Sequence, residues 1–81
     1  MTVLDPSLTH FIVADRGEWG FGVTLKEAAK ARPYSGQTKL SANAFAYRVA
    51  EGTYINDMGQ LAYPKDCPEP VQVDVVTGVP L

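Results

Sequence analysis

The chain has 81 residues, of which 20% are charged and 46% hydrophobic, and its formal net charge is -2. This length suffices for one domain with a thin core and not for two, and the composition is globular rather than disordered. The mild acidity and the absence of a basic run argue against direct nucleic-acid binding, which needs clustered Lys and Arg. The single cysteine, Cys67, excludes an intrachain disulfide and a Cys-rich metal site.

The sequence also bears on location. No apolar stretch approaches the roughly 18 residues that cross a bilayer, and the first residues lack the basic and apolar regions of a secretory signal. These absences predict a cytoplasmic protein without a membrane partner. Residues 1–81 are expected to form one domain, with 1–8 and 77–81 as peripheral tails.

Two strands are predicted near the start. Thr9–Ala14 is a short apolar run, and in Glu18–Val23 large side chains alternate with glycines, as in a strand with one packed face. The polar residues between them favour a turn, so the pair predicts a β-hairpin. Trp19 and Phe21 are expected to be core residues.

A short helix is predicted to follow, from a capping box at Thr24–Glu27. Thr24 can accept a hydrogen bond from the backbone of Glu27, and the Glu27 carboxylate can reach back to the N–H of Thr24. Val23 and Ala28 would form a hydrophobic staple. Pro33 should end the helix, and since about two turns are unstable alone in water, the helix should dock on a sheet.

The stretch Leu40–Ala50 alternates like a strand, but its alanines also suit a helix. We assign a strand, because the following Glu-Gly pair can close a hairpin into Thr53–Ile55. Further strands are predicted at Gln60–Tyr63 and, at a sheet edge, at Val71–Val76. The predicted fold class is α+β: a small, mainly antiparallel sheet in the order β-β-α-β-β-β, with one short helix packed on one face.

No catalytic constellation is evident. His10 is the one histidine and starts a strand, and no nucleophile-elbow pattern surrounds the serines. Cys67 is preceded by Asp66, whose charge disfavours a reactive thiolate. We therefore predict a protein that is not an enzyme, with no catalytic residues, no cofactor and no metal.

The glycines that precede Thr24 allow two interpretations. Gly17, Gly20 and Gly22 lie just before a helix N-terminus, where a phosphate ligand could bind. Their spacing matches neither the dinucleotide fingerprint nor the P-loop. Close packing or a strand bulge explains Gly20 and Gly22 more simply.

The tyrosines are the best positive indication of function. Four in so short a chain are many, and tyrosine is enriched at protein interfaces. The expected site is a sheet face that the single helix leaves bare. The C-terminal half is slightly acidic and could meet a basic partner. The predicted protein-binding residues are Tyr34, Tyr47, Tyr54 and Tyr63.

The run from Trp19 to Ala28 resembles a pattern, aromatic-Gly-x-Gly-x-Thr-Leu-x-x-Ala, seen in small uncharacterised proteins of bacteriophages and prophages. Segments similar to Tyr47–Val49 and Asp57–Pro64 often follow there. The resemblance implies a phage accessory protein that binds a host protein or a defence system, as anti-CRISPR proteins do. Two alternatives stay open: a self-assembling module that forms a homodimer, and a phosphate-ligand binder at the glycines before Thr24.

Overall fold

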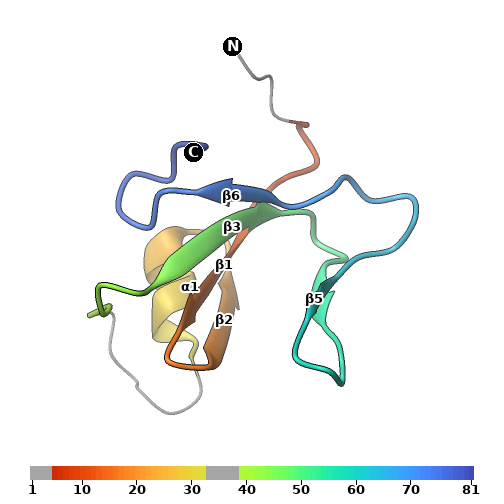
Figure 1. Cartoon of the computed structure of the whole chain (residues 1–81). Coiled ribbons are helices and arrows are strands. Elements are labelled where there is room, and N and C mark those ends of the chain that lie inside the picture. The colour runs from red at the N-terminus through yellow and green to blue at the C-terminus, as the bar shows by residue number, and fades with distance from the viewer. Residues whose placement is uncertain (1–4, 33–38) are drawn as a thin grey trace.

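The computed structural model describes residues 5–32 and 39–81, which form an α+β fold (Figure 1). A four-stranded antiparallel sheet has the order β2-β1-β3-β6, and β4 pairs with β5 in a separate two-stranded sheet. The one helix of these residues lies on one side of the larger sheet and the β4–β5 hairpin on the other. The elements are β1 (His10–Asp15), β2 (Glu18–Gly22), α1 (Leu25–Lys30), β3 (Phe45–Val49), β4 (Tyr54–Ile55), β5 (Leu61–Ala62) and β6 (Val71–Val73).

The predicted fold class is confirmed, and each of the six strands predicted by residue range has a counterpart, although the predicted order β-β-α-β-β-β counts only five and the strands divide between two sheets. The first hairpin also agrees with the prediction. Arg16 and Gly17 join β1 to β2 with positive φ angles of 55° and 78°, the backbone of a type I′ turn, whose twist matches that of the strands.

Helix α1 packs directly on β2 at two glycines. A Cβ atom at Gly20 would lie 1.7 Å from the carbonyl oxygen of Ala28, and one at Gly22 would lie 2.7 Å from the Ala28 nitrogen. Only glycine permits the helix backbone to approach this closely. The close-packing interpretation of these glycines therefore accounts for both of them.

The N-terminus of α1 is capped as the sequence predicts, with one difference. The Thr24 hydroxyl accepts a hydrogen bond from the Glu27 nitrogen at 3.1 Å. The Glu27 carboxylate reaches the backbone nitrogen of Val23, at 3.2 Å, and not that of Thr24. Val23 itself is 57% exposed, so it does not bury an apolar side chain as the predicted staple required. The helix has six residues, too few to cross a bilayer, and it is the only one in the described ranges.

The core lies between α1 and the sheet. Val13 on β1 faces Gly20 on one side and Ala46 on the other, and Ala46 in turn faces Val73 of β6. Side chains alternate between the two faces of a sheet, so these positions all point toward the helix. The buried cluster consists of Val13, Ala28, Ala29, Ala46 and Val73.

The strand assigned to Leu40–Ala50 is present but shorter, at Phe45–Val49, and the hairpin predicted from it into Thr53–Ile55 is wrong. Strand β3 pairs with β1 on one edge and with β6 on the other. No edge of β3 is left for β4. A turn in which the Thr53 nitrogen donates to the Ala50 carbonyl, at 3.0 Å, instead directs the chain away from the sheet.

The last strand lies at a sheet edge, as predicted, but it ends at Val73 rather than Val76. The Asp74 carboxylate accepts hydrogen bonds from the nitrogens of Val76 and Thr77, at 2.7 and 3.1 Å, and so forms a turn. These backbone donors lower the pKa of Asp74 below its ordinary value.

Both predicted tails contact the sheet. Leu8 is 1% exposed, and its carbonyl accepts a hydrogen bond from Arg48 at 2.8 Å. At the other end of the chain, Pro80 forms a bridge with Val73, and the Leu81 nitrogen donates to the Gln72 carbonyl at 3.2 Å. The C-terminal residues thus lie along the outer edge of β6.

Candidate protein-binding surface

The face of the sheet opposite α1 carries a group of aromatic side chains. Trp19 and Phe21 of β2 stand opposite Ala14 and Ile12 of β1, at positions that alternate with the helix-facing glycines. On β3, Phe45 and Tyr47 stand opposite the same two β1 residues. The register therefore brings rings from two strands onto one face. This aromatic face consists of His10, Trp19, Phe21, Phe45 and Tyr47.

Ring contacts link these side chains. The Trp19 and Phe45 rings meet edge to face with centroids 5.9 Å apart, and Phe45 meets Tyr47 in the same way at 5.9 Å. His10 stacks on Phe21 at 5.1 Å. Such geometries are favourable for aromatic pairs. The contacts fix the rings in place, so the face is preorganised.

The aromatic face is only partly covered. Phe21 is 41% exposed and Phe45 is 37% exposed, while Trp19 is half-buried. The expectation that Phe21 is a core residue is therefore wrong. The reason is that α1 covers the other face of the sheet, where the glycines of β2 lie, and turns Phe21 away from it.

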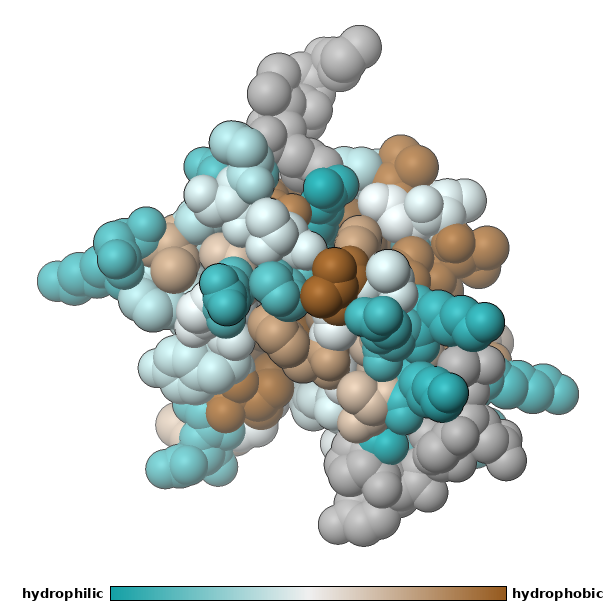
Figure 2. Space-filling view, turned by 180° about the vertical axis from the view of Figure 1, so that it is seen from behind, coloured by the Kyte–Doolittle hydropathy of each residue, from teal (hydrophilic) through white to brown (hydrophobic). Residues whose placement is uncertain are grey.

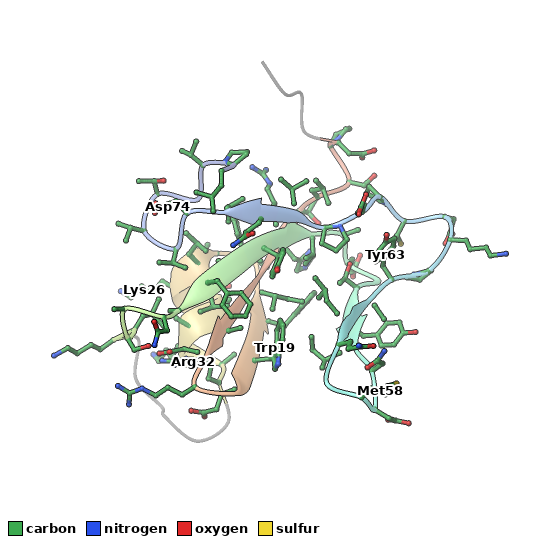
Figure 3. All side chains as sticks on the ribbon, viewed as in Figure 1. Trp19, Lys26, Arg32, Met58, Tyr63 and Asp74 are labelled. Atoms are coloured by element: carbon green, nitrogen blue, oxygen red, sulfur yellow. The ribbon has the colours of Figure 1, made fainter. Side chains whose placement is uncertain are left out.

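A cleft of about 270 Å³ separates part of this face from the β4–β5 hairpin. Figure 3 shows Trp19 on the hairpin side of the sheet and Arg32 on the helix side. The Thr53 hydroxyl is buried and has no hydrogen-bond partner among the described residues. Seen from behind, apolar atoms gather near the middle of the surface and again toward the lower left, where the hairpin lies (Figure 2). The cleft is lined by Ile12, Trp19, Gly20, Phe21, Thr53, Tyr54 and Ile55.

The four tyrosines do not form one surface. Tyr47 lies on the aromatic face, and Tyr54, which is 54% exposed, lines the cleft. Tyr63 is 40% exposed but lies beyond β5, away from Trp19 (Figure 3). Tyr34 lies outside the described residues. The site is thus centred on Trp19, Phe21 and Phe45. The alternation of side chains in Phe45–Val49 is the sequence signal from which Phe45 could have been assigned to this face.

Neither His10 nor Cys67, the residues considered for catalysis, lines the cleft. The His10 Nδ1 atom is 2.7 Å from the Thr9 hydroxyl, and its ring stacks on Phe21. Cys67 borders a second hollow of about 430 Å³, together with Glu51 and Asp66. Within residues 5–32 and 39–81, no group of three metal-binding side chains comes together.

The segment from Glu51 to Glu69, which includes the hairpin, carries negative charge. Its exposed ionised side chains are four carboxylates and one lysine. A surface of this kind attracts a basic partner and repels an acidic one. These residues are Glu51, Asp57, Lys65, Asp66 and Glu69.

The fold and the site define a small α+β protein that exposes an apolar, aromatic face and carries a negatively charged segment from Glu51 to Glu69. Comparison with protein families, curated proteins and solved structures gives no significant match.

Proposed function

We propose that this chain is a non-catalytic protein-binding module and that the aromatic face is its binding surface. The observation that carries the proposal is the exposure of Phe21 and Phe45, at 41% and 37%, within a set of rings held in contact with one another. Exposed aromatic groups dominate the binding energy of protein interfaces. Rings that are already fixed lose little entropy on binding.

The class of partner follows from the resemblance of the segment Trp19–Ala28 to phage accessory proteins. On that basis the partner is a host protein, such as a component of a defence complex, met in the bacterial cytoplasm. The negative charge of the segment from Glu51 to Glu69 supports a partner with a basic surface.

Capture from a bacterial lysate tests the proposal when the wild-type chain is compared with matched variants. The test variant is Phe21→Ser with Phe45→Ser. The control is Val76→Ser with Leu81→Ser, which removes equally apolar side chains that are 83% and 80% exposed elsewhere. Circular dichroism first verifies that each variant is folded.

We expect the wild type and the control to retain the same host protein and the aromatic variant to lose it. Equal capture by all three chains would contradict the assignment of the surface. Failure of the wild type to retain any protein would contradict the proposed function. Sedimentation of the free wild type then tests the homodimer alternative, since a monomer at high concentration excludes it.

A further inference from the structure

The cleft is bordered by an edge strand of the larger sheet. Strand β2 is the outermost strand of the larger sheet, and Trp19, Gly20 and Phe21 all line the cleft. Because a two-residue turn joins β1 to β2, Asp15 and Glu18 form a hydrogen-bonded pair. Along an antiparallel ladder such pairs alternate with non-hydrogen-bonded pairs, so Trp19 and Phe21 belong to non-hydrogen-bonded pairs with β1. The N–H and C=O groups of Trp19 and Phe21 therefore point outward from the sheet. No other described residue pairs with them.

The two edges of the sheet differ in their protection. The outer edge of β6 is covered by the C-terminal residues, through the Pro80 bridge and the Leu81 hydrogen bond. Strand β2, with the sequence EWGFG, has no proline, no lysine and no covering segment among the described residues. Natural proteins usually protect such an edge. An edge left open beside an apolar cleft offers both backbone pairing and a side-chain pocket.

Resting on the proposed function, we infer that the cleft receives an extended peptide segment of the partner, which adds a strand to β2. Its backbone pairs with that of Trp19 and Phe21. One large apolar side chain enters the cleft between Ile12 and Ile55. Added strands gain affinity from main-chain hydrogen bonds and specificity from pockets for alternate side chains.

Charge complementarity defines the residues that flank this apolar side chain. Glu51 and Asp57 are exposed and lie on either side of the cleft-lining segment Thr53–Ile55 in the chain. The segment from Glu51 to Glu69 carries four carboxylates against one lysine. A bound strand with Lys or Arg on each side of its apolar residue matches this negative charge.

A second copy of the chain does not fit this edge. Two antiparallel β2 strands would lie about 4.8 Å apart, and both α1 helices would then stand on the same face of the joined sheet. Each helix lies directly over Gly20 and Gly22 of its own β2. Packed helices need about 8–10 Å between their axes, so the helices would collide. A partner strand without a helix above it avoids this collision.

A displayed library of random nonapeptides tests the inference on the full chain. We expect enriched sequences to contain one large apolar residue flanked by Lys or Arg. Trp19 is the only tryptophan, so its fluorescence reports binding of each synthetic peptide. On binding, the amide protons of Trp19 and Phe21 should become protected from exchange with solvent.

Matched peptides and variants separate the parts of this site. N-methylation of the peptide residues whose N–H groups pair with β2 should weaken binding roughly tenfold. N-methylation of the alternate residues, whose N–H groups point away from β2, should weaken it much less. Glu51→Lys with Asp57→Lys should weaken the basic peptides more than Asp66→Lys with Glu69→Lys, which changes the net charge equally at positions farther along the chain from the cleft-lining segment.

The outcomes distinguish this inference from the proposed function. Capture of a host protein that depends on Phe21 and Phe45, without any enriched peptide, would overturn strand addition and leave the protein-binding function standing. Enriched peptides that leave the Trp19 and Phe21 amides unprotected would also overturn it. Failure of both experiments would remove the function itself.

Discussion

The Asp15 carboxylate lies 3.2 Å from the guanidinium of Arg32, and both side chains are shielded from solvent, at 1% and 2% exposure. Arg32 also donates to the Ala29 carbonyl at 2.8 Å. Ser41 donates to the same carboxylate from its hydroxyl and, at 3.0 Å, from its backbone nitrogen. With Ser41, this pair connects the end of β1, the second residue after the helix and the approach to β3. It therefore fixes α1 on the sheet and, with it, the aromatic face on the opposite side.

Breaking this pair should destabilise the fold. Asp15→Asn removes the negative charge that faces the buried guanidinium, and Arg32→Met removes the guanidinium that faces the buried carboxylate, so each should lower the Tm strongly. The double variant should lose less than the sum of the two single variants. Lys65→Met, at an exposed position that does not act on Asp15, is the control and should shift stability by less than about 0.5 kcal/mol. Additive losses would show that the pair is not coupled.

Stability should depend on pH through the same carboxylate. Hydrogen bonds from Ser41, followed by the charges of Arg16 and Arg32, lower the pKa of Asp15 below its ordinary value of 3.8. A pKa lowered on folding contributes stability that is present above the unfolded pKa and lost as pH falls through the folded one. The free energy of unfolding should therefore decrease between about pH 5 and pH 2.

Ser41→Ala should flatten this pH dependence, because it removes the hydroxyl hydrogen bond that contributes most to the lowered pKa of Asp15. Chemical denaturation at a series of pH values measures the effect. Ser7→Ala, at an exposed serine, is the matched control. A wild-type slope in the Ser41 variant would contradict the assigned cause.

Gly20→Ala should prevent α1 from docking. The added Cβ would lie 1.7 Å from a backbone oxygen of the helix, which cannot rotate away, so the expected cost exceeds about 3 kcal/mol. Gly17→Ala meets no atom within 4 Å and suffers only from its φ of 78°, at about 1–2 kcal/mol. Denaturation midpoints compare the two variants. Equal losses would mean that the helix does not press on β2.

Thr24→Ala should lower the free energy of unfolding by about 0.5–2 kcal/mol, because the Glu27 nitrogen loses its acceptor at the helix N-terminus. Thr24→Ser keeps the hydroxyl and should restore most of this stability. Thermal unfolding of both variants checks the expectation. A loss of the same size in the serine variant would assign the effect to the methyl group instead.

Thr53→Val should stabilise the protein by about 1 kcal/mol, because it replaces a buried hydroxyl, for which the described residues supply no partner, with a methyl group of the same size. Thr53→Ser keeps the hydroxyl and loses the methyl group, so it should be less stable than the wild type. A destabilised valine variant would reveal a hydrogen bond at this position.

Local signals predicted much of the fold because they depend on neighbouring residues. The alternation in Glu18–Val23 and the capping box at Thr24 predicted the first hairpin and the helix start, and both are present. The pairing of β4 could not be predicted in this way. Strand β4 can pair with β3 only if one edge of β3 is free, and β1 and β6 occupy both edges. Which strands pair with β3 therefore depends on residues far apart in the chain.

The sequence by itself determined that this is a small α+β chain with a short capped helix and glycines that permit close packing. Only the tertiary structure decided which side chains are displayed. Helix α1 occupies the glycine side of β2, so Trp19 and Phe21 lie on the opposite face with Phe45. Phe21, expected in the core, is instead part of the exposed surface, because burial depends on which of two sheet faces the helix covers.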